Sequence, residues 1–387
     1  MRSRPLLLSV GVTCALILAS APALSPAQEA PSAERSRSAQ DRPPRIQVAL
    51  LLDTSSSMSG LIDQARTQLW SIVNELAEAT QQGVQPELEV ALYEYGNDGL
   101  SAESGYVRRR LGFTRDLDRV SEELFALTTN GGSEYCGWVM QQALAELEWS
   151  QDPRDLRVLY VAGNEPFTQG PVDFRTVAAE ARARDIRVNT IHCGPAQQGV
   201  AGFWHEGAQL AGGAYLSIDH DQAVVELAAP QDTELAALNS RLNETFVPYG
   251  PEGERGRQRQ LGQDGRAAST SEANLAKRAI SKASGLADSQ SWDLVDALSS
   301  GRVELDALEP EAIPEPMRTM STQEKQAFVE QKRTERKKLE SRIRTLKQQR
   351  DVWVAEEKAR QAQDAPTLGD AIRDSVREQA QQKAYDF

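Results

Sequence analysis

The chain has 387 residues, with 43 Lys and Arg against 56 Asp and Glu, so its formal net charge is −13. A chain this acidic lacks the basic surface that general nucleic-acid binding, or the coating of an anionic membrane, requires. Its contents of 40% hydrophobic and 26% charged residues exclude collagen-like, mucin-like and multi-span membrane proteins, and its length allows about two or three domains.

Residues 1–27 have the pattern of a secretory signal peptide. Arg2 and Arg4 precede an apolar run over residues 6–19, which is too short to span a bilayer comfortably, and small residues follow. We therefore expect an exported mature chain, periplasmic or extracellular, without a transmembrane segment. An uncleaved N-terminal anchor is the alternative. Residues 28–44 are rich in Ser, Arg, Pro and Gln, and are expected to form a disordered leader.

Strand and helix patterns alternate from residue 45 to about residue 220. Continuous apolar runs are typical of parallel strands buried on both faces, and apolar residues three or four apart are typical of helices. The alternation predicts an α/β fold, a doubly wound and mostly parallel sheet that binds ligands at the carboxyl ends of its strands. The expected strands cover residues 46–52, 88–93, 106–113, 156–161, 186–191 and 213–218, and the expected helices cover 61–76, 117–127, 135–147, 174–184 and 203–210.

Beyond residue 231 the expected structure is all helical. Residues 231–309 are predicted to form a helical and irregular extension, residues 321–362 one long charged helix, and residues 363–387 a helical tail. The long helix contains a short heptad stripe, which predicts a short coiled coil or helical hairpin and offers a surface for self-association. A solvated helix face is the alternative. The stripe consists of Leu339, Ile343, Leu346, Arg350 and Trp353.

An Asp-x-Ser-x-Ser motif, residues 53–57, follows the first strand and opens the first helix. Three oxygen-bearing side chains two residues apart, in a loop that curls over a strand end, can converge on one hard divalent cation. Mg, Mn or Ca would suit such ligands, and a site built mostly from hydroxyls leaves the cation with affinity for an outside carboxylate.

This motif, in its strand–turn–helix setting, resembles the start of a von Willebrand factor type A domain. The order of elements over residues 45–220 fits the whole domain, and Gly131-Gly132-Ser133 stands where the family has Gly-Gly-Thr. The resemblance implies a metal-ion-dependent adhesion site. Its implied ligands are Asp53, Ser55, Ser57 and Ser133.

One position departs from the pattern of that family. The family usually reads Thr-Asp-Gly after the fourth strand, and this chain has Gly163 in place of the Asp. The site thereby loses one negative charge, so we expect a weaker affinity for metal. Asn164, Glu165 and Glu134 are candidates to compensate, and a vestigial, metal-free site is the alternative.

Two cysteines remain once the signal peptide is removed. Cys136 and Cys193 can form one disulfide in an oxidising compartment, or they can stay buried as free thiols. In the strand order of the resembled family, both lie at the carboxyl-end face beside the strand that carries Gly163. The resemblance therefore predicts a Cys136–Cys193 disulfide that passes over Gly163.

Patterns of enzymes are incomplete in this chain. The segment 204–209 resembles the helix of zinc proteases, but Gln209 stands where the second His is required. Cys136 and His192 would form a nucleophile–base pair only in competition with the disulfide. We predict that the protein is not an enzyme, with a hydrolase as the minor alternative.

The region after residue 231 resembles the tail of exported bacterial proteins that carry the same domain, in segments such as 238–246, 292–297 and 367–372. Taken together, the resemblances imply an exported binding or adhesion protein. Its strand-end face would bind a protein or a cell-envelope component through a divalent cation. The alternative is a structural or scaffold protein of the envelope whose adhesion site is silent and metal-free.

Overall fold

The computed structural model describes residues 42–218, 227–284, 289–360 and 368–387. The expected signal peptide, residues 1–27, and nearly all of the expected leader, residues 28–44, lie outside the described residues. Every element below belongs to one compact unit, residues 43–387.

Six strands form one sheet in the order β4-β3-β1-β5-β6-β7. All neighbours pair in parallel except β4, which is antiparallel to β3. The mostly parallel sheet expected from the sequence is thereby confirmed, and β1 lies inside it between β3 and β5. The strands are β1 (Arg45–Asp53), β3 (Glu87–Tyr95), β4 (Val107–Thr114), β5 (Leu156–Gly163), β6 (Arg187–Cys193) and β7 (Tyr215–Ile218).

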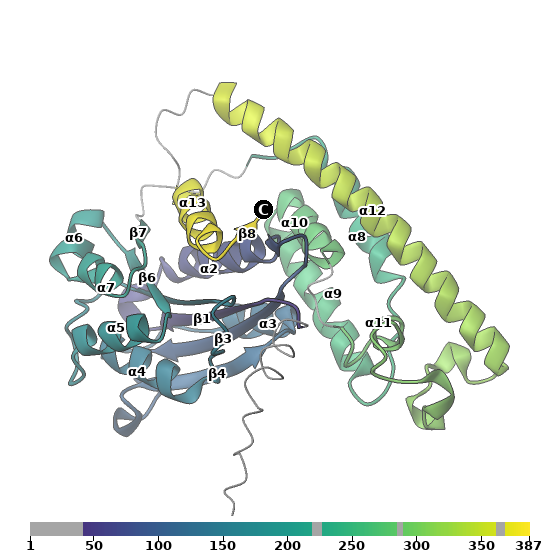
Figure 1. Ribbon diagram of the computed structural model, residues 1–387, viewed down its shortest axis with the longest axis horizontal. Coiled ribbons are helices and arrows are strands. Elements are labelled where there is room, and N and C mark those ends of the chain that lie inside the picture. The colour runs from purple at the N-terminus through teal and green to yellow at the C-terminus, as the bar shows by residue number, and fades with distance from the viewer. Residues whose placement is uncertain (1–41, 219–226, 285–288, 361–367) are drawn as a thin grey trace, which may run out of the picture. The chain divides into compact units, whose positions relative to one another are not determined.

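Helices cover both faces of this sheet (Figure 1). The β1 side chains alternate between two cores, so that Leu50 and Leu52 lie in one core while Ala49 and Leu51 lie in the other. One core also takes residues of α2 (Ile62–Leu76) and α3 (Leu117–Ala126); the other takes residues of α4 (Cys136–Glu146), α5 (Phe174–Ala183) and α7 (Trp204–Leu210). The short helix α6 (Ala196–Ala201) was not expected from the sequence.

The region after residue 231 is helical, as expected. It consists of α8 (Asp232–Asn243), α9 (Gly253–Thr270), α10 (Glu272–Ala283), α11 (Leu294–Ser299) and the long α12 (Thr322–Arg360), with three short 3-10 helices at Leu305–Ala307, Pro310–Ala312 and Glu315–Met317. None of the helices in the described part of the chain combines the length and the apolar character that crossing a membrane needs.

The heptad stripe of α12 has its partners within the same chain. Leu339, Ile343 and Leu346 are buried in a core shared with α8 and α10. Arg350, which interrupts the apolar stripe, donates a hydrogen bond of 2.6 Å from Nε to Oδ1 of Asp232 at the start of α8. The stripe therefore acts as an intramolecular packing surface over these residues.

The last segment of the chain packs on the sheet domain. Helix α13 (Leu368–Gln381) lies beside α2, and β8 (Tyr385–Asp386) pairs antiparallel with β2 (Thr80–Gln81) (Figure 1). Four of its apolar side chains are buried in the same core as those of α2, so this segment supplies part of the domain's interior. They are Ile372, Val376, Ala380 and Tyr385.

Candidate functional site

The Asp-x-Ser-x-Ser motif lies at the carboxyl end of β1, where a short 3-10 helix (Ser56–Met58) leads toward α2. A loop before α4 is held against it by backbone hydrogen bonds. Asn130 N donates to Thr54 O over 2.9 Å, and Ser56 N donates to Gly131 O. The Gly131-Gly132-Ser133 segment is therefore placed next to the motif, as the resemblance implied.

Asp53 is fully buried, with an exposed fraction of 0%. Its Oδ1 accepts a 2.7 Å hydrogen bond from Ser55 N, whereas its Oδ2 is buried and has no hydrogen-bond partner among the residues that the structure describes. Burial raises the pKa of Asp53 to about 8; the Ser55 amide opposes this shift, and Glu134 and Glu165 add to it by repulsion. A buried carboxyl group in this state needs either a proton or a cation.

The two serines of the motif extend the site toward solvent. The Ser55 and Ser57 hydroxyl oxygens are 2.8 Å apart, and the Ser57 hydroxyl donates to Oδ1 of Asn164 over 3.1 Å. Ser55 is buried and Ser57 is exposed. The oxygen donors therefore run from a buried carboxyl group to an exposed hydroxyl, so the site is open on one side.

Glu134 is a further acid of this site, and it is nearly buried, with 4% exposed. Burial raises its pKa, and the nearby Ser55 side chain opposes that shift. Its backbone N donates to Oε1 of Gln169. The expected ligand Ser133 makes no hydrogen bond with its side chain in the described part of the chain. The structure thus brings the side chain of Glu134 to the motif.

The fold gives a steric reason for the glycine at position 163. A Cβ added there would lie 2.5 Å from the Tyr95 hydroxyl oxygen and 3.0 Å from Cβ of Asp53. Tyr95 is fully buried, and its hydroxyl donates to Ala162 O over 3.1 Å. The position where the family has an aspartate is therefore closed by a neighbouring tyrosine.

The expected Cys136–Cys193 disulfide is not formed, and this prediction is corrected. Both residues are free thiols and both are buried, and burial raises the pKa of each thiol. The Tyr95 hydroxyl lies 3.5 Å from Sγ of Cys136 and occupies the space beside Gly163 that the bridge was expected to cross.

The alternative pairing of Cys136 with His192 is not formed either. In the described part of the chain, neither ring nitrogen of His192 has a hydrogen-bond partner, although both are buried. Among the described residues, no group of three or more His, Cys, Asp or Glu side chains is arranged to hold a metal ion. A cation at this site would therefore depend on the serine hydroxyls as well as on the carboxylates.

Comparison with known proteins identifies the domain. Residues 47–200 match the model of the von Willebrand factor type A domain family. A search of the curated proteins finds no match. The chain is similar to the solved structure of the conserved hypothetical protein BatB from Bacteroides thetaiotaomicron, with 15% identity, 46% of this chain and 92% of that chain covered, and a TM-score of 0.35.

Two further solved structures are similar over the same share of this chain, 46%. A von Willebrand factor type A protein from Catenulispora acidiphila is 15% identical, with 39% of that chain covered and a TM-score of 0.33. The pilus adhesin SpaC from Lactobacillus rhamnosus GG is 14% identical, with 28% covered and a TM-score of 0.35. By its family match and its sheet, the chain carries a von Willebrand factor type A domain at residues 47–200.

Proposed function

We propose that this protein is exported and binds a protein or a cell-envelope component through the carboxyl-end face of its type A domain, with a divalent cation as the bridge. One observation carries the proposal: Oδ2 of Asp53 is buried without a partner among the described residues, while Oδ1 of the same carboxyl group accepts from the backbone N of Ser55, whose hydroxyl lies 2.8 Å from that of Ser57. Buried polar atoms are seldom left unpaired, and those that are need an explanation. A cation shared with the hydroxyls would supply the missing partner.

The residues present fit a hard cation. Asp53, Ser55 and Ser57 offer one carboxylate and two hydroxyls, which are the oxygen donors that Mg, Mn and Ca take in proteins. When bound, the ion would attract a carboxylate of the partner from the solvent side, where Ser57 is exposed. Ser133 as a further ligand stays a prediction.

Export and the division of labour along the chain are parts of the same proposal. The N-terminal pattern supports export to the periplasm or the exterior. The domain at 45–220 would bind the partner, and the helical region at 231–362 would position it. Self-association through the long helix stays a prediction. We infer binding rather than catalysis, because the buried thiols and the unpartnered His192 make no nucleophile–base pair.

A silent, structural site is the second candidate, and a specific observation favours it. Tyr95 closes the position of the missing aspartate, so the site has one carboxylate fewer there. A protonated Asp53 would then complete a neutral, metal-free face. In that case the domain would serve as a scaffold of the envelope.

The two candidates are separated by a double substitution, Ser55→Ala with Ser57→Ala, in the chain without residues 1–27. We expect the unchanged chain to bind Mg²⁺ or Mn²⁺ in calorimetry and to retain envelope components in magnesium but not in chelator. The double variant should lose both properties. If the unchanged chain in chelator and the double variant in magnesium both retain as much as the unchanged chain in magnesium, the scaffold is supported.

A matched control comes from the same loop. The Ser59 hydroxyl lies 3.0 Å from that of Thr129, and among the described residues no hydrogen bond joins it to the hydroxyls of Ser55 or Ser57. Ser59→Ala should therefore leave cation binding and retention unchanged. Circular dichroism of all variants would show that the fold is kept.

A further inference from the structure

We infer that Glu134 is the second carboxylate of this site and replaces the side chain that Gly163 lacks. The inference rests on the proposed function, because it concerns the same cation. The second carboxylate would then come from the residue after the Gly-Gly-Ser segment, and not from the end of β5, where Gly163 stands. Two groups of observations carry it: the space around Glu134 and the contacts that hold it in place.

Two glycines show where the Glu134 side chain lies. A Cβ added to Gly132 would be 2.5 Å from Oε1 of Glu134 and 3.5 Å from Cβ of Ser55. A Cβ added to Gly96 would be 2.7 Å from Oδ1 of Asp53 and 3.0 Å from Cγ of Glu134. Both acids therefore pack against one glycine, and the Glu134 carboxylate lies over another glycine beside Ser55.

The local structure holds Glu134 in this place. Its backbone N donates to the Gln169 side chain, from the loop after β5, and it lies two residues before the start of α4 at Cys136. The preceding loop is tied to the motif, because Gly131 N donates to Oγ of Ser56 over 2.8 Å. The backbone that carries Glu134 is thus held in place before any ligand binds, as the backbone of a ligand residue should be.

Glu165 is the competing acid, and the contacts favour Glu134. Glu165 is half-buried, and its backbone O accepts a 2.8 Å hydrogen bond from Nε1 of Trp204. Its carboxylate makes no hydrogen bond in the described part of the chain and acts on Asp53 and Glu134 by repulsion. The Glu134 carboxylate, in contrast, lies beside Ser55, because a Cβ added to Gly132 would be 2.5 Å from Oε1 of Glu134 and 3.5 Å from Cβ of Ser55.

The charge of the site follows from this assignment. Asp53 and Glu134 together carry two negative charges when ionised, which balances a divalent cation. The cation would then bind without help from a partner, because its charge is already compensated. It would also attract a partner carboxylate less strongly than a site built mostly from hydroxyls would.

The test compares Glu134→Gln with the matched control Glu165→Gln, which removes one charge from the same face. Mn²⁺ is titrated into each folded chain by calorimetry, and the rise in melting temperature with Mn²⁺ is measured in parallel. We expect Glu134→Gln to weaken Mn²⁺ binding about tenfold or more, and Glu165→Gln to weaken it less than about threefold. Glu134→Asp keeps the charge and should retain more affinity than Glu134→Gln.

The outcomes separate this inference from the proposed function. Equal Mn²⁺ affinity in Glu134→Gln and the unchanged chain, or a greater loss in Glu165→Gln, overturns the role of Glu134 and leaves the cation bridge standing. If the folded, unchanged chain binds no Mn²⁺, the cation bridge itself fails and the role of Glu134 fails with it. If Glu134→Gln does not fold, Glu134→Asp decides, because a shortened ligand should lower the affinity and a mere bystander should not.

Discussion

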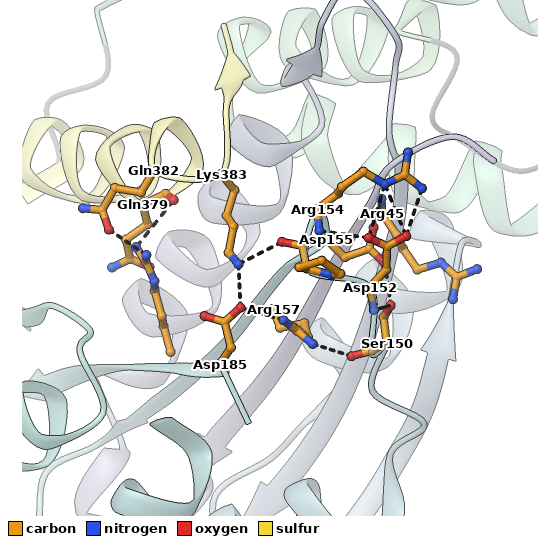
Figure 2. A network of polar contacts seen from close by, with 12 residues as sticks. Arg45, Ser150, Asp152, Arg154, Asp155, Arg157, Asp185, Gln379, Gln382 and Lys383 are labelled. Carbon is orange, nitrogen blue, oxygen red and sulfur yellow. Dashed lines mark hydrogen bonds and ion pairs between the residues drawn. The ribbon is translucent and has the colours of Figure 1, made fainter. Parts of the chain in front are cut away.

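The two ends of the parallel strands differ in how they treat buried charge. At the amino ends, charged side chains pair with one another and with the returning C-terminal segment (Figure 2). At the carboxyl ends, Asp53 is fully buried, and one of its oxygens is unpaired among the described residues. Repulsion from the nearby acid Glu134 raises the pKa of Asp53 further. We call the amino ends the closed end, because charges of the same chain pair there, and the carboxyl ends the open end, because Oδ2 of Asp53 has no hydrogen-bond partner among the described residues.

The amino-end network joins segments far apart in the sequence. Lys383 and Arg157 both bind the Asp185 carboxylate; burial alone would raise the pKa of Asp185, but these two cations lower it. The Asn189 and Gln379 side chains exchange hydrogen bonds of 3.1 and 2.6 Å. Polar groups that satisfy one another in this way stabilise and orient a docked segment.

The contrast indicates what each end does. The acid Asp185 at the amino ends is paired with Arg157 and Lys383 and needs no ligand, so these ends serve the fold, although Nε of Arg157 is buried there without a hydrogen-bond partner among the described residues. An unpaired buried carboxyl group is a cost to the fold, and such groups gather at functional sites. The amino ends therefore have a structural role, and the unpaired carboxyl group at the carboxyl ends supports the binding role that we propose for them.

The largest expected effect comes from a substitution at the closed end, in the C-terminal segment. Tyr385→Ala removes a fully buried aromatic ring from the core under α2, and should lower the free energy of unfolding by about 3–5 kcal/mol, measured by urea denaturation. Tyr385→Phe keeps the ring and loses only the hydroxyl, which donates to Arg45 O over 2.9 Å, so about 1 kcal/mol is expected. Equal, small losses in both variants would show that the segment does not contribute to the core.

The next effect concerns the open end and its dependence on pH. The pKa of Asp53 is raised from its ordinary 3.8 to about 8 in the folded chain, so between these values the folded state keeps a proton that the unfolded state has lost. This group's contribution to stability is therefore greatest below about pH 4 and declines as the pH rises to 8.

Asp53→Asn removes this titration. In chelator, the difference in unfolding free energy between the variant and the unchanged chain should increase in favour of the variant from pH 4 to pH 8. In the unchanged chain, added Mn²⁺ should stabilise more at pH 8 than at pH 5, because the ion competes with the proton. A difference that stays constant across this range would contradict the raised pKa.

The smallest effect sharpens the comparison at the closed end. The Lys383–Asp185 pair is partly exposed, since 49% of the Asp185 side chain is accessible. A double-mutant cycle with Lys383→Ala and Asp185→Ala should give a coupling energy of about 1 kcal/mol or less. A coupling of several kcal/mol would mean that this ion pair, and not the buried apolar contacts, holds the C-terminal segment.

Several features were predictable from the sequence because they depend on neighbours along the chain. The apolar runs predicted the strands, the Asp53-to-Ser57 spacing placed oxygen donors at a strand end, and the run without Pro or Gly after Ser321 predicted the long helix. Each signal is local, since strand and helix periods and turn chemistry are set within a few residues.

What only the tertiary structure decided depends on distant partners. The sequence shows α13 as a tail, and its docking on α2 appears only once both helices are placed. Likewise, the hydroxyl of Tyr95, from another strand, closes the position at Gly163, and the side chain of Glu134 lies beside Ser55 of the motif. The order of strands in the sheet determines which side chains meet, and the spacing of residues along one chain carries no record of those distances.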